Sequence, residues 1–415
     1  MKILQINNVY NKGSTGKITY DIHSELKKQG IESVVCYGRG EKVSEPNVYK
    51  TCGEFESKLN HFWANLSGVL YGGCLFSTNK LIKIIKKEKP DVVHLQCLNG
   101  FFVNIYRLVT WLKKHNVKTV LTLHAEFMYT GGCGHSIDCN QWSTRNGCGH
   151  SACPRYRSDM KVWFFDRSRT MWKKMKKAFD GFNDNLIVTS VSPWLMERAK
   201  ISPILEGKHH EVVLNGVNTD IFHCYDTSDL RLQTGLTNEK VIFHATPSFN
   251  DDINNIKGGY YVLKLAEKML GENIKFIVAG SYPEGLKVPQ NVVLLGKVSD
   301  QEILAKYYSM ADITLLTSRK ETFSMVTAES LCCGTPVVGF KAGAPEQIAI
   351  PEYSSFVDYG DVEGLYKAVS EFLNKNLSEE EIAQVAQNKY SKNIMVRKYE
   401  GIYKQSMQFD RNKRK

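Results

Sequence analysis

The sequence lacks any apolar run long enough to cross a bilayer. Its longest stretch without Asp, Glu, Lys or Arg, Leu59–Asn79, contains asparagines, glycines and a histidine, whereas a spanning helix needs about 20 predominantly apolar residues. The apolar run near the start, Ile3–Ile6, is too short for a secretory leader. The 11 cysteines are an odd number, which disfavours a disulfide framework. We therefore expect a chain without a membrane span, in the reducing cytoplasm.

Repeats and nucleic-acid motifs are also missing. No Gly-x-y period, heptad array or repeat of roughly 20–50 residues is visible, which excludes fibrous and solenoid folds. What is present is an ordinary globular composition of 415 residues, 42% hydrophobic and 23% charged, with a net charge of +11. This length predicts two domains with sizeable cores. No recognised nucleic-acid motif accompanies the basic excess, so we expect no nucleic-acid partner.

Short apolar runs rich in Val and Ile alternate with stretches of helical periodicity, a pattern typical of parallel sheets covered on both faces. The expected strands are Ile3–Val9, Ser33–Tyr37, Asp91–Gln96, Thr119–His124 and Leu186–Ser192, then Val241–Ala245, Lys275–Ala279, Asn291–Leu295, Ile313–Thr317 and Val337–Phe340. The expected helices include Lys17–Lys28, Leu81–Lys89, Val103–Lys114, Tyr261–Leu270, Gln301–Met310 and Val326–Cys333.

A turn-rich stretch interrupts this series and carries the turn signal Asn215-Gly216. We predict an α/β protein of two doubly wound, Rossmann-like domains that face a deep cleft. The N-terminal domain covers 1–205 and includes a Cys-rich loop at 131–155, the C-terminal domain covers 206–385, and a helix with a basic tail occupies 386–415. Open parallel sheets bind ligands outside the carboxyl ends of their strands.

A glycine-rich loop, Asn11–Ile18, follows the first strand and opens a helix. It resembles a P-loop, but a Walker A motif needs Gly in place of Asn11 and Ser or Thr in place of Ile18. Two interpretations stay open: a turn that caps the helix, and an anion or substrate site at a helix N-terminus. The second makes Gly13, Ser14, Thr15 and Gly16 an acceptor or phosphate loop.

In the segment Ser318–Pro336, Glu321 precedes an expected helix and Glu329 lies on it, eight residues further along. Gly334 and Pro336 end that helix. At 1.5 Å per residue the carboxylates lie about 12 Å apart, too far for the pair of a glycosidase, which needs roughly 5–10 Å. The spacing suits one elongated ligand with its phosphates at the helix N-terminus. Two solvated surface glutamates remain the alternative.

Four cysteines lie within 21 residues: Cys133, Cys139, Cys148 and Cys153. Four thiolates in a loop-rich segment of a reduced protein suit a structural zinc ion, although their spacing is looser than that of common zinc motifs. Free thiols are the alternative. We expect a structural zinc and no catalytic metal, because the chain contains no Asp-x-Asp.

A basic stretch from Arg167 to Lys177 is interleaved with Trp163, Phe164, Phe165, Met171 and Trp172. Such a stretch can lie on an anionic membrane surface. It can equally be a solvated helix face whose other side enters the core, and both interpretations stay open.

Several motifs resemble one family. They are Glu321-x7-Glu329 with Gly334-Thr-Pro336-Val-Val338, then Val213-Leu-Asn-Gly-Val-Asn218 with Phe222, Lys257-Gly258, Val278-Ala-Gly280, Leu295-Gly-Lys-Val-Ser299, Leu121-Thr-Leu-His124 and Gly13-Ser-Thr-Gly16. Together they resemble the retaining GT-B glycosyltransferases of family 4, which build bacterial polysaccharides. The resemblance covers nearly the whole chain and also implies that the last helix crosses back to the N-terminal domain.

The resemblance implies a role for each matching residue. Glu321, Lys257 and His124 become catalytic: Glu321 and His124 contact the transferred sugar, and Lys257 offsets the charge of the departing diphosphate. Donor binding falls to Glu329 on the ribose, to the backbone of Thr322, Phe323, Ser324 and Met325 on the diphosphate, and to Gly280 and Lys297. The family's arginine before the lysine is absent here, and Arg319 or Lys320 can replace it.

The implied reaction transfers a hexosyl group with retention from a UDP- or GDP-sugar to a saccharide on a polyprenyl diphosphate. Its implied setting is capsule, exopolysaccharide or O-antigen (lipopolysaccharide) synthesis, peripherally at the inner face of the membrane. Two alternatives remain. A GT-B-like epimerase would isomerise the donor without an acceptor, and a non-catalytic sugar-binding assembly protein would bind nucleotide without transfer.

Overall fold

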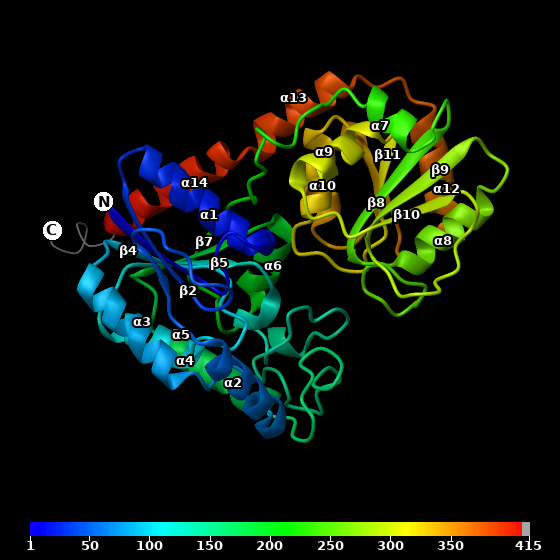
Figure 1. The fold of residues 1–415 in the computed structure, drawn as a ribbon. Coiled ribbons are helices and arrows are strands. Elements are labelled where there is room, and N and C mark those ends of the chain that lie inside the picture. Colours follow the sequence, from blue (N-terminus) through cyan, green and yellow to red (C-terminus); the bar gives the residue numbers. More distant parts are fainter. Residues whose placement is uncertain (409–415) are drawn as a thin grey trace. The chain divides into compact units, whose positions relative to one another are not determined.

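The computed structural model describes residues 1–408 (Figure 1). It divides into two compact units, one of residues 1–214 with the chain from Met395 onward, and one of residues 215–394. Each unit holds one sheet, and every strand pairing in both sheets is parallel. This confirms the predicted α/β class with two doubly wound, Rossmann-like domains.

Unit 1 has a seven-stranded sheet in the order β3-β2-β1-β4-β5-β6-β7. Its elements are β1 (Lys2–Asn7), α1 (Gly13–Lys28), β2 (Glu32–Tyr37), β3 (Val48–Lys50), α2 (Glu54–Ser67), α3 (Leu75–Glu88), β4 (Val92–Leu95), α4 (Ile105–Lys114), β5 (Thr119–Leu123), the 3₁₀ turns η1 (Glu126–Met128) and η2 (Gln141–Ser143), α5 (Ser168–Phe179), β6 (Leu186–Ser190), α6 (Pro193–Ile201) and β7 (His209–Val212).

The last helix, α14 (Lys392–Gln408), completes unit 1. Its apolar side, which includes Val396, Tyr399 and Tyr403, packs in one buried cluster with residues of α1 and of the central strands. The ring of His94 on β4 bonds to the Tyr403 hydroxyl at 2.7 Å. In Figure 1, α1 and α14 lie on one face of this sheet, and α3, α4 and α5 lie on the other.

Unit 2 has a six-stranded sheet in the order β10-β9-β8-β11-β12-β13. Its elements are α7 (Ser228–Gln233), β8 (Lys240–Ser248), α8 (Gly259–Lys268), β9 (Ile274–Ser281), β10 (Val292–Gly296), α9 (Gln301–Met310), β11 (Ile313–Leu316), α10 (Met325–Cys332), β12 (Val337–Phe340), α11 (Pro345–Ile348), η3 (Pro351–Tyr353), β13 (Ser354–Val357), α12 (Val362–Leu373) and α13 (Glu379–Tyr390).

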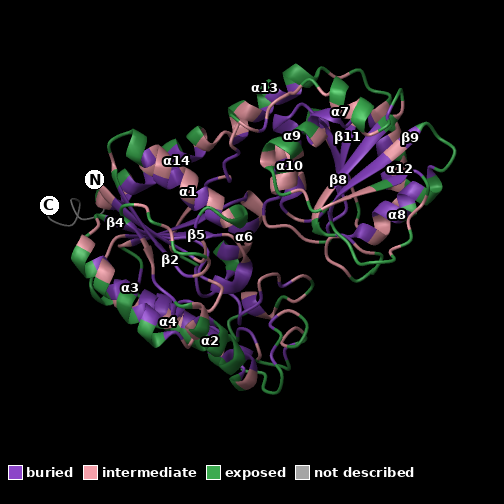
Figure 2. Cartoon of the chain, in the orientation of Figure 1, coloured by how far each residue is buried: buried purple, intermediate pink, exposed green. Residues whose placement is uncertain are grey.

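The strand order of unit 2 reverses between β8 and β11. The chain goes from β8 outward to β9 and β10, then returns to β11 on the other side of β8. Loops diverge at such a switch point and leave a ligand crevice at the carboxyl ends of the strands. The core beneath it is apolar, and Ile242, Phe276 and Leu315 are fully buried there. Figure 2 shows the buried strands in purple.

The expected strands are all present within a few residues of their predicted ends. The three that the sequence pattern did not predict are β3, β7 and β13, and each is an edge strand. The sequence of β7, His-His-Glu-Val, is polar and half-buried, so it carries no apolar run for a pattern to detect. Within residues 1–408 no helix combines the length and the hydropathy that a membrane crossing requires.

The unit boundaries differ from the predicted domains. Unit 1 extends to Leu214 instead of 205, because β7 joins its sheet beside β6. Unit 2 extends to Ile394 instead of 385, since α13 packs on α10 and the Val217–Ser391 bridge ties its end to that unit. From Met395 onward α14 belongs to unit 1. The described part of the predicted basic tail ends at residue 408, and 409–415 lie outside the described residues.

Candidate active site

A pocket of about 430 Å³ opens at the switch point of unit 2. Its size suits a small-molecule site. It is lined by Ala245, Thr246, Pro247, Ala279, Gly280, Ser281, Lys297, Val298, Leu304, Tyr308, Val326 and Glu329. Three predicted donor-binding residues, Gly280, Lys297 and Glu329, are therefore brought together. A β-carbon at Gly280 would lie 2.5 Å from the Thr246 carbonyl oxygen, so only glycine lets β8 and β9 approach here.

Glu329 is held from the side by a buried tyrosine. The Tyr308 hydroxyl on α9 donates to Glu329 Oε2 at 3.4 Å. Burial raises the pKa of Tyr308 well above its usual value, so the phenol stays protonated and remains a donor. Tyr308 is a pocket residue that sequence reasoning missed, because nothing in its spacing on α9 sets it apart from a core tyrosine.

The turn before α10 is fixed at both ends. Glu321 exchanges backbone hydrogen bonds with Ala342 and Ala344, at 3.0 and 3.3 Å. Ser324 adopts a φ of +86° and its hydroxyl accepts from the Thr327 N–H. Phe323 is buried. Val326, in the first turn of α10, lines the pocket. The first turn of α10 holds no acidic residue, so no carboxylate of that turn offsets the positive end of the helix.

Lys257 and Glu321 form an ion pair with 2.6 Å between Lys257 Nζ and Glu321 Oε1. The loop that carries Lys257 is anchored because the Thr317 hydroxyl donates to the Lys257 carbonyl and the Arg319 N–H donates to Ile256. Gly258 has a φ of +69°, and a β-carbon there would lie 2.1 Å from the Thr317 oxygen. The structure thus brings together two residues that the sequence separates by 64 positions.

The two replacement cations proposed for the missing arginine also follow β11. The Arg319 guanidinium lies 5.8 Å from the centre of the Tyr359 ring, so its side chain is engaged there. Lys320 is its neighbour in the turn. Neither residue lines the pocket described above.

His124 follows β5 in unit 1, at the carboxyl end of the sheet. Its Nε2–H donates to Gln96 Oε1 at 2.8 Å, and Gln96 in turn donates to Gln5. Burial lowers the pKa of His124 to about 4, so the ring is neutral at pH 7. The second ring nitrogen is then an acceptor. The catalytic role predicted for His124 stays a prediction.

The glycine-rich loop forms the first turn of α1. Gly13 has a φ of +62°, and the Asn11 N–H donates back to the Gly16 carbonyl. A β-carbon at Gly16 would lie 3.0 Å from the Val9 side chain, which gives that glycine a packing reason. Ser14 and Thr15 occupy the same turn. The acceptor or phosphate role of the four residues stays a prediction.

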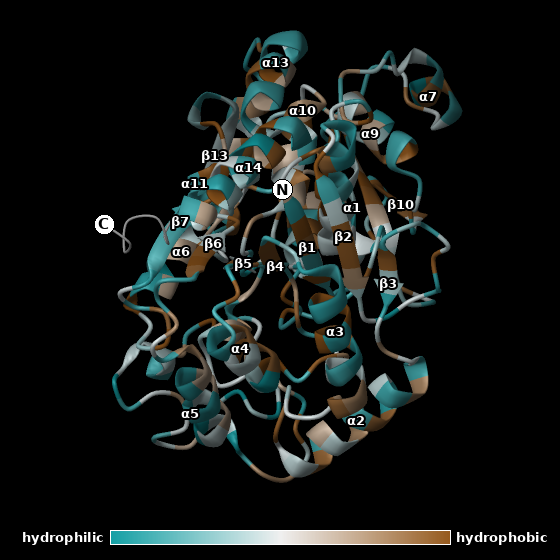
Figure 3. Ribbon diagram, turned by 90° about the vertical axis from the view of Figure 1, so that its left-hand side faces the viewer, coloured by the Kyte–Doolittle hydropathy of each residue, from teal (hydrophilic) through white to brown (hydrophobic). Residues whose placement is uncertain are grey.

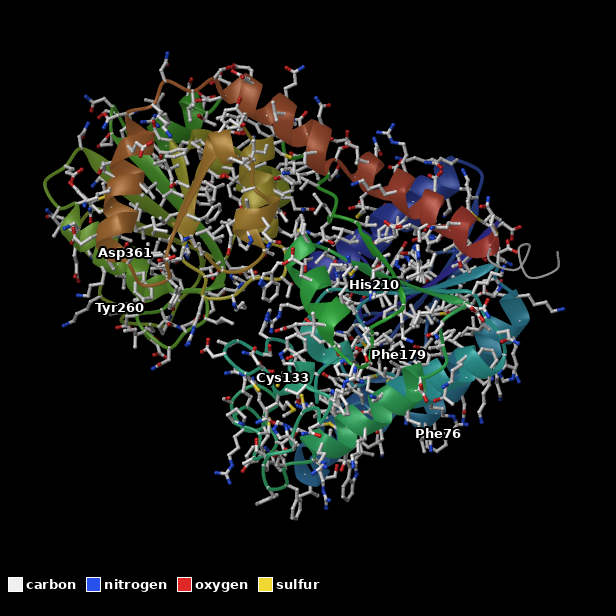
Figure 4. All side chains as sticks on the ribbon, turned by 180° about the vertical axis from the view of Figure 1, so that it is seen from behind. Phe76, Cys133, Phe179, His210, Tyr260 and Asp361 are labelled. Carbon is white, nitrogen blue, oxygen red and sulfur yellow. The ribbon has the colours of Figure 1, made fainter. Side chains whose placement is uncertain are left out.

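The Cys-rich segment contains little regular structure, and three of its four cysteines are buried (Cys133, Cys148 and Cys153; Cys133 is labelled in Figure 4). Cys139 is partly exposed. Nowhere in residues 1–408 do three or more His, Cys, Asp or Glu side chains come together so that they could hold a metal ion. The structure therefore lends the zinc site no support. The site stays a prediction, which a zinc assay on the purified protein tests and a folded, metal-free protein would contradict.

A buried ion pair between Glu126 and Arg198 anchors the Cys-rich segment. Glu126 is fully buried, and its carboxylate accepts from Arg198, Tyr129 and Ser136, with Arg198 Nε 2.6 Å away. The Arg198 guanidinium also lies within 5 Å of the ring centres of Trp142 and Trp194. Sequence reasoning missed this tie. Its only signal was a carboxylate inside the apolar run Ala125–Met128.

Family comparisons divide the chain in a similar way. Residues 15–221 match the model described as Glycosyltransferase Family 4, and residues 242–375 match the model described as Glycosyl transferases group 1. The chain belongs to the glycosyltransferases of family 4. This confirms the family that the motifs predicted.

Curated relatives of this glycosyltransferase are distant. It is 24% identical over 366 residues to a putative colanic acid biosynthesis glycosyl transferase of Escherichia coli, covering 84% of this chain and 85% of that one. It is 26% identical over 249 residues to N-acetyl-alpha-D-glucosaminyl L-malate synthase of Bacillus anthracis, covering 56% of this chain and 63% of the relative. The second alignment spans less than two thirds of that enzyme.

Solved structures establish the fold. Sucrose-phosphate synthase from Thermosynechococcus elongatus superposes with a TM-score of 0.66 at 15% identity, covering 98% of this chain and 99% of that one. The Anabaena HepE protein in complex with UDP-glucose superposes with a TM-score of 0.64 at 14% identity, covering 98% and 100%. The fold of the glycosyltransferase is therefore GT-B, as predicted.

The candidate residues of the glycosyltransferase fall into two groups, one in each matched region. The pocket, Lys257 and Glu321 all lie within the group 1 match, residues 242–375. His124, Glu126 and the Cys-rich segment lie within the Family 4 match, residues 15–221. The pocket and the ion pair of Lys257 with Glu321 thus both belong to unit 2.

Proposed function

We propose that this glycosyltransferase transfers a hexosyl group from a nucleoside-diphosphate sugar, with retention, to a lipid-linked saccharide. The observation that carries the proposal is the pocket of unit 2, where a carboxylate, a lysine and the first turn of α10 converge at the switch point. The HepE structures, which are in complex with UDP or UDP-glucose, support a nucleotide-sugar donor. The donor is a UDP- or GDP-sugar in this proposal.

Each group has one chemical task in the proposal. Glu329, oriented by Tyr308, accepts hydrogen bonds from the ribose hydroxyls. The N–H groups from Thr322 to Met325 and the positive end of α10 bind the diphosphate. Glu321 contacts the donor sugar. Lys257, whose Nζ lies 2.6 Å from Glu321 Oε1, shifts to the diphosphate as the bond between sugar and phosphate breaks. A preorganised cation at the leaving group stabilises the transition state.

Retention follows in this proposal because the acceptor hydroxyl attacks on the face from which the diphosphate departs. No divalent metal is required, since lysines and a helix terminus offset the phosphate charge. The acceptor is a saccharide on a polyprenyl diphosphate, used in capsule, exopolysaccharide or lipopolysaccharide synthesis at the inner face of the membrane. The similarity to a putative colanic acid biosynthesis glycosyl transferase supports this setting.

A thermal-shift screen of nucleotide sugars tests the proposal. A ligand at about 100 times its Kd stabilises by about 2.7 kcal/mol, which corresponds to roughly 5–10 °C for a unit of this size. Glu329→Ala removes the ribose acceptor and should abolish the shift. Glu267→Ala, at an exposed position of α8, should keep it.

Two results would contradict the donor site. One is a shift that survives in Glu329→Ala, and the other is the absence of any shift with every UDP- and GDP-sugar. Once the donor is known, the anomeric configuration of the product decides between retention and inversion.

A further inference from the structure

Exposed aromatic side chains gather on unit 1. The aromatic cluster comprises Phe55, Phe62, Trp63, Phe76, Trp163, Phe164 and Phe165, each at least 46% exposed. Phe76 and Phe55 reach 84% and 81%. These values are far above what core packing leaves, and a contiguous apolar patch of this kind marks an interaction site.

The cluster is one surface, although it comes from three segments of the chain. The ring centres of Phe62 on α2 and Trp163 lie 5.4 Å apart. The backbone N–H of Trp163 donates to the Asn65 carbonyl at 3.0 Å, which fixes the loop on α2. The start of α3, where Phe76 projects (labelled in Figure 4), is joined to α2 because Ser77 donates to Glu56 at 3.0 Å. Figures 2 and 3 show α2 with both exposed and hydrophobic residues along its length.

Cations adjoin this aromatic cluster. Helix α5 begins three residues after Phe165 and carries five basic residues and no acidic one: Arg169, Lys173, Lys174, Lys176 and Lys177. Helix α4 likewise has no acidic residue. The two helices border a groove of about 690 Å³ lined by Arg107, Lys113, Lys114, Lys174 and Lys177. The two acidic residues at the start of α2 are engaged, Glu54 by the Gly40 N–H and Glu56 by Ser77.

Burial differs along the basic, aromatic stretch. Met171 and Trp172 are buried, so within α5 the apolar side enters the core and the lysines lie on the outer side of the helix. Trp163, Phe164 and Phe165 are exposed, and they join aromatic residues of α2 that the sequence pattern had not connected with them.

We propose that the aromatic cluster and the basic face of α4 and α5 dock unit 1 on an anionic lipid bilayer. Aromatic rings are suited to the interfacial zone, where one part of the ring is apolar and another is wet. Lysines beside them attract anionic headgroups, each contributing about 1 kcal/mol near such a surface. The charge complementarity selects a bilayer over a second copy of the chain, because a two-fold contact through this face would oppose α5 to α5 and place like charges together.

A polar pocket adjoins the cluster. It measures about 330 Å³, and its lining includes His61, next to Phe62 in the sequence, and Lys161, two residues before Trp163. Asn8, Asn99 and Asp159 complete its polar side. If the proposed lipid-linked acceptor is correct, this pocket receives its saccharide end while the lipid stays in the bilayer. The docking itself does not depend on that assignment.

Vesicle binding of the full chain, without donor or acceptor, tests the docking. The probes are phosphatidylcholine vesicles with and without about one-third phosphatidylglycerol. We expect binding only to the anionic vesicles, weakened by about 0.5 M salt. The charge reversal K173E/K174E/K177E should lower the affinity roughly a hundredfold. The control R397E/K398E/K404E makes the same change of charge at exposed positions of α14. It should lower the vesicle affinity far less.

The aromatic part has its own variant. F55S/F76S/F164S replaces the three most exposed rings and should lower the affinity at least tenfold, whereas L232S/I253S/I303S, at exposed positions of unit 2, should have no effect. The melting temperature shows that each variant folds. Equal binding of the test and control variants overturns the proposal, as does the absence of binding to anionic vesicles. An aromatic variant that instead converts a dimer to a monomer assigns the face to self-association and also overturns it.

The test of the docking surface is independent of the test of the donor site. A nucleotide-induced thermal shift measures unit 2, and vesicle binding measures unit 1. A chain that binds vesicles without responding to any nucleotide sugar contradicts the donor site alone, and the converse contradicts the docking surface alone.

Discussion

At the scale of residues, Lys257 and Glu321 orient each other as an ion pair. With 2.6 Å between the charged atoms and side-chain exposures of 33% and 18%, the lysine is partly desolvated yet still able to turn toward a ligand. A cation held in this way is preorganised for the developing charge of a leaving diphosphate.

Lys257→Ala should therefore lower kcat by roughly a hundredfold or more while the KM for the donor changes less, because the interaction is strongest in the transition state. Steady-state kinetics with the donor found in the screen measure this. Lys264→Ala, on the exposed face of α8, is the control. A wild-type kcat in Lys257→Ala would remove the lysine from the reaction, and loss of activity with EDTA would contradict metal independence.

Three histidines with desolvated rings predict how stability depends on pH. Burial lowers the pKa of His94 to about 3 and those of His124 and His244 to about 4. Below pH about 6.5 the unfolded chain takes up protons that the native chain does not. The free energy of unfolding should thus fall with pH from about 6.5 toward 4, by up to about 1.4 kcal/mol per pH unit for each histidine.

Urea denaturation at a series of pH values measures this slope. His94→Gln removes one titrating ring. Between pH 6 and pH 4 the free energy of unfolding of this variant should therefore fall less steeply than that of the wild type, and the difference in slope should correspond to about one titrating group. A wild-type midpoint that stays constant from about pH 7 to pH 5 is incompatible with neutral, buried rings.

At the scale of elements, the Cys-rich segment is held by Glu126 and Arg198. Removing one partner of a buried ion pair leaves an uncompensated charge, which costs about 3–5 kcal/mol. Arg198→Ala should therefore destabilise unit 1 by that amount and expose the segment to limited proteolysis. Arg145→Ala, at an exposed position of the same segment, should do neither. Equal stability of the two variants would show that another contact, such as a metal, holds the segment.

The sequence allowed much of the architecture to be predicted because the central strands are apolar runs. Val337–Phe340 and Gln301–Met310 have the predicted bounds. The edge strand β7 was not predicted, since its residues are mostly polar and only half-buried and its pairing is set by tertiary context. In the site, Glu321 and Glu329 were marked by their spacing and their family motif. Tyr308 and Arg198 could not be, because only packing shows which carboxylate each of them contacts.

At the scale of the whole molecule, unit 2 is one continuous segment and unit 1 is not. A fragment of residues 215–394 contains its own sheet, core and pocket, so it should fold alone and show the same nucleotide-induced thermal shift. A fragment of residues 1–214 lacks α14. Burying each large apolar side chain is worth about 1.5–3 kcal/mol, and the loss of several, Tyr399 and Tyr403 among them, is comparable to the whole stability of a typical domain.

Circular dichroism and thermal denaturation of the two fragments check this asymmetry. Cooperative unfolding of 1–214 alone would show that α14 is dispensable, and an unfolded 215–394 would show that the second unit needs the first. Adding a peptide of residues 392–415 to the first fragment should restore cooperative unfolding if α14 acts through its packing alone.

The position of α14 also bears on biosynthesis. Domains commonly acquire structure as they leave the ribosome, the N-terminal one first. Here the residues that close the first sheet's apolar face are translated after all of unit 2. The order is thereby reversed: the later segment can mature first, while the earlier one waits with an uncovered surface on which a chaperone can act until synthesis passes residue 403.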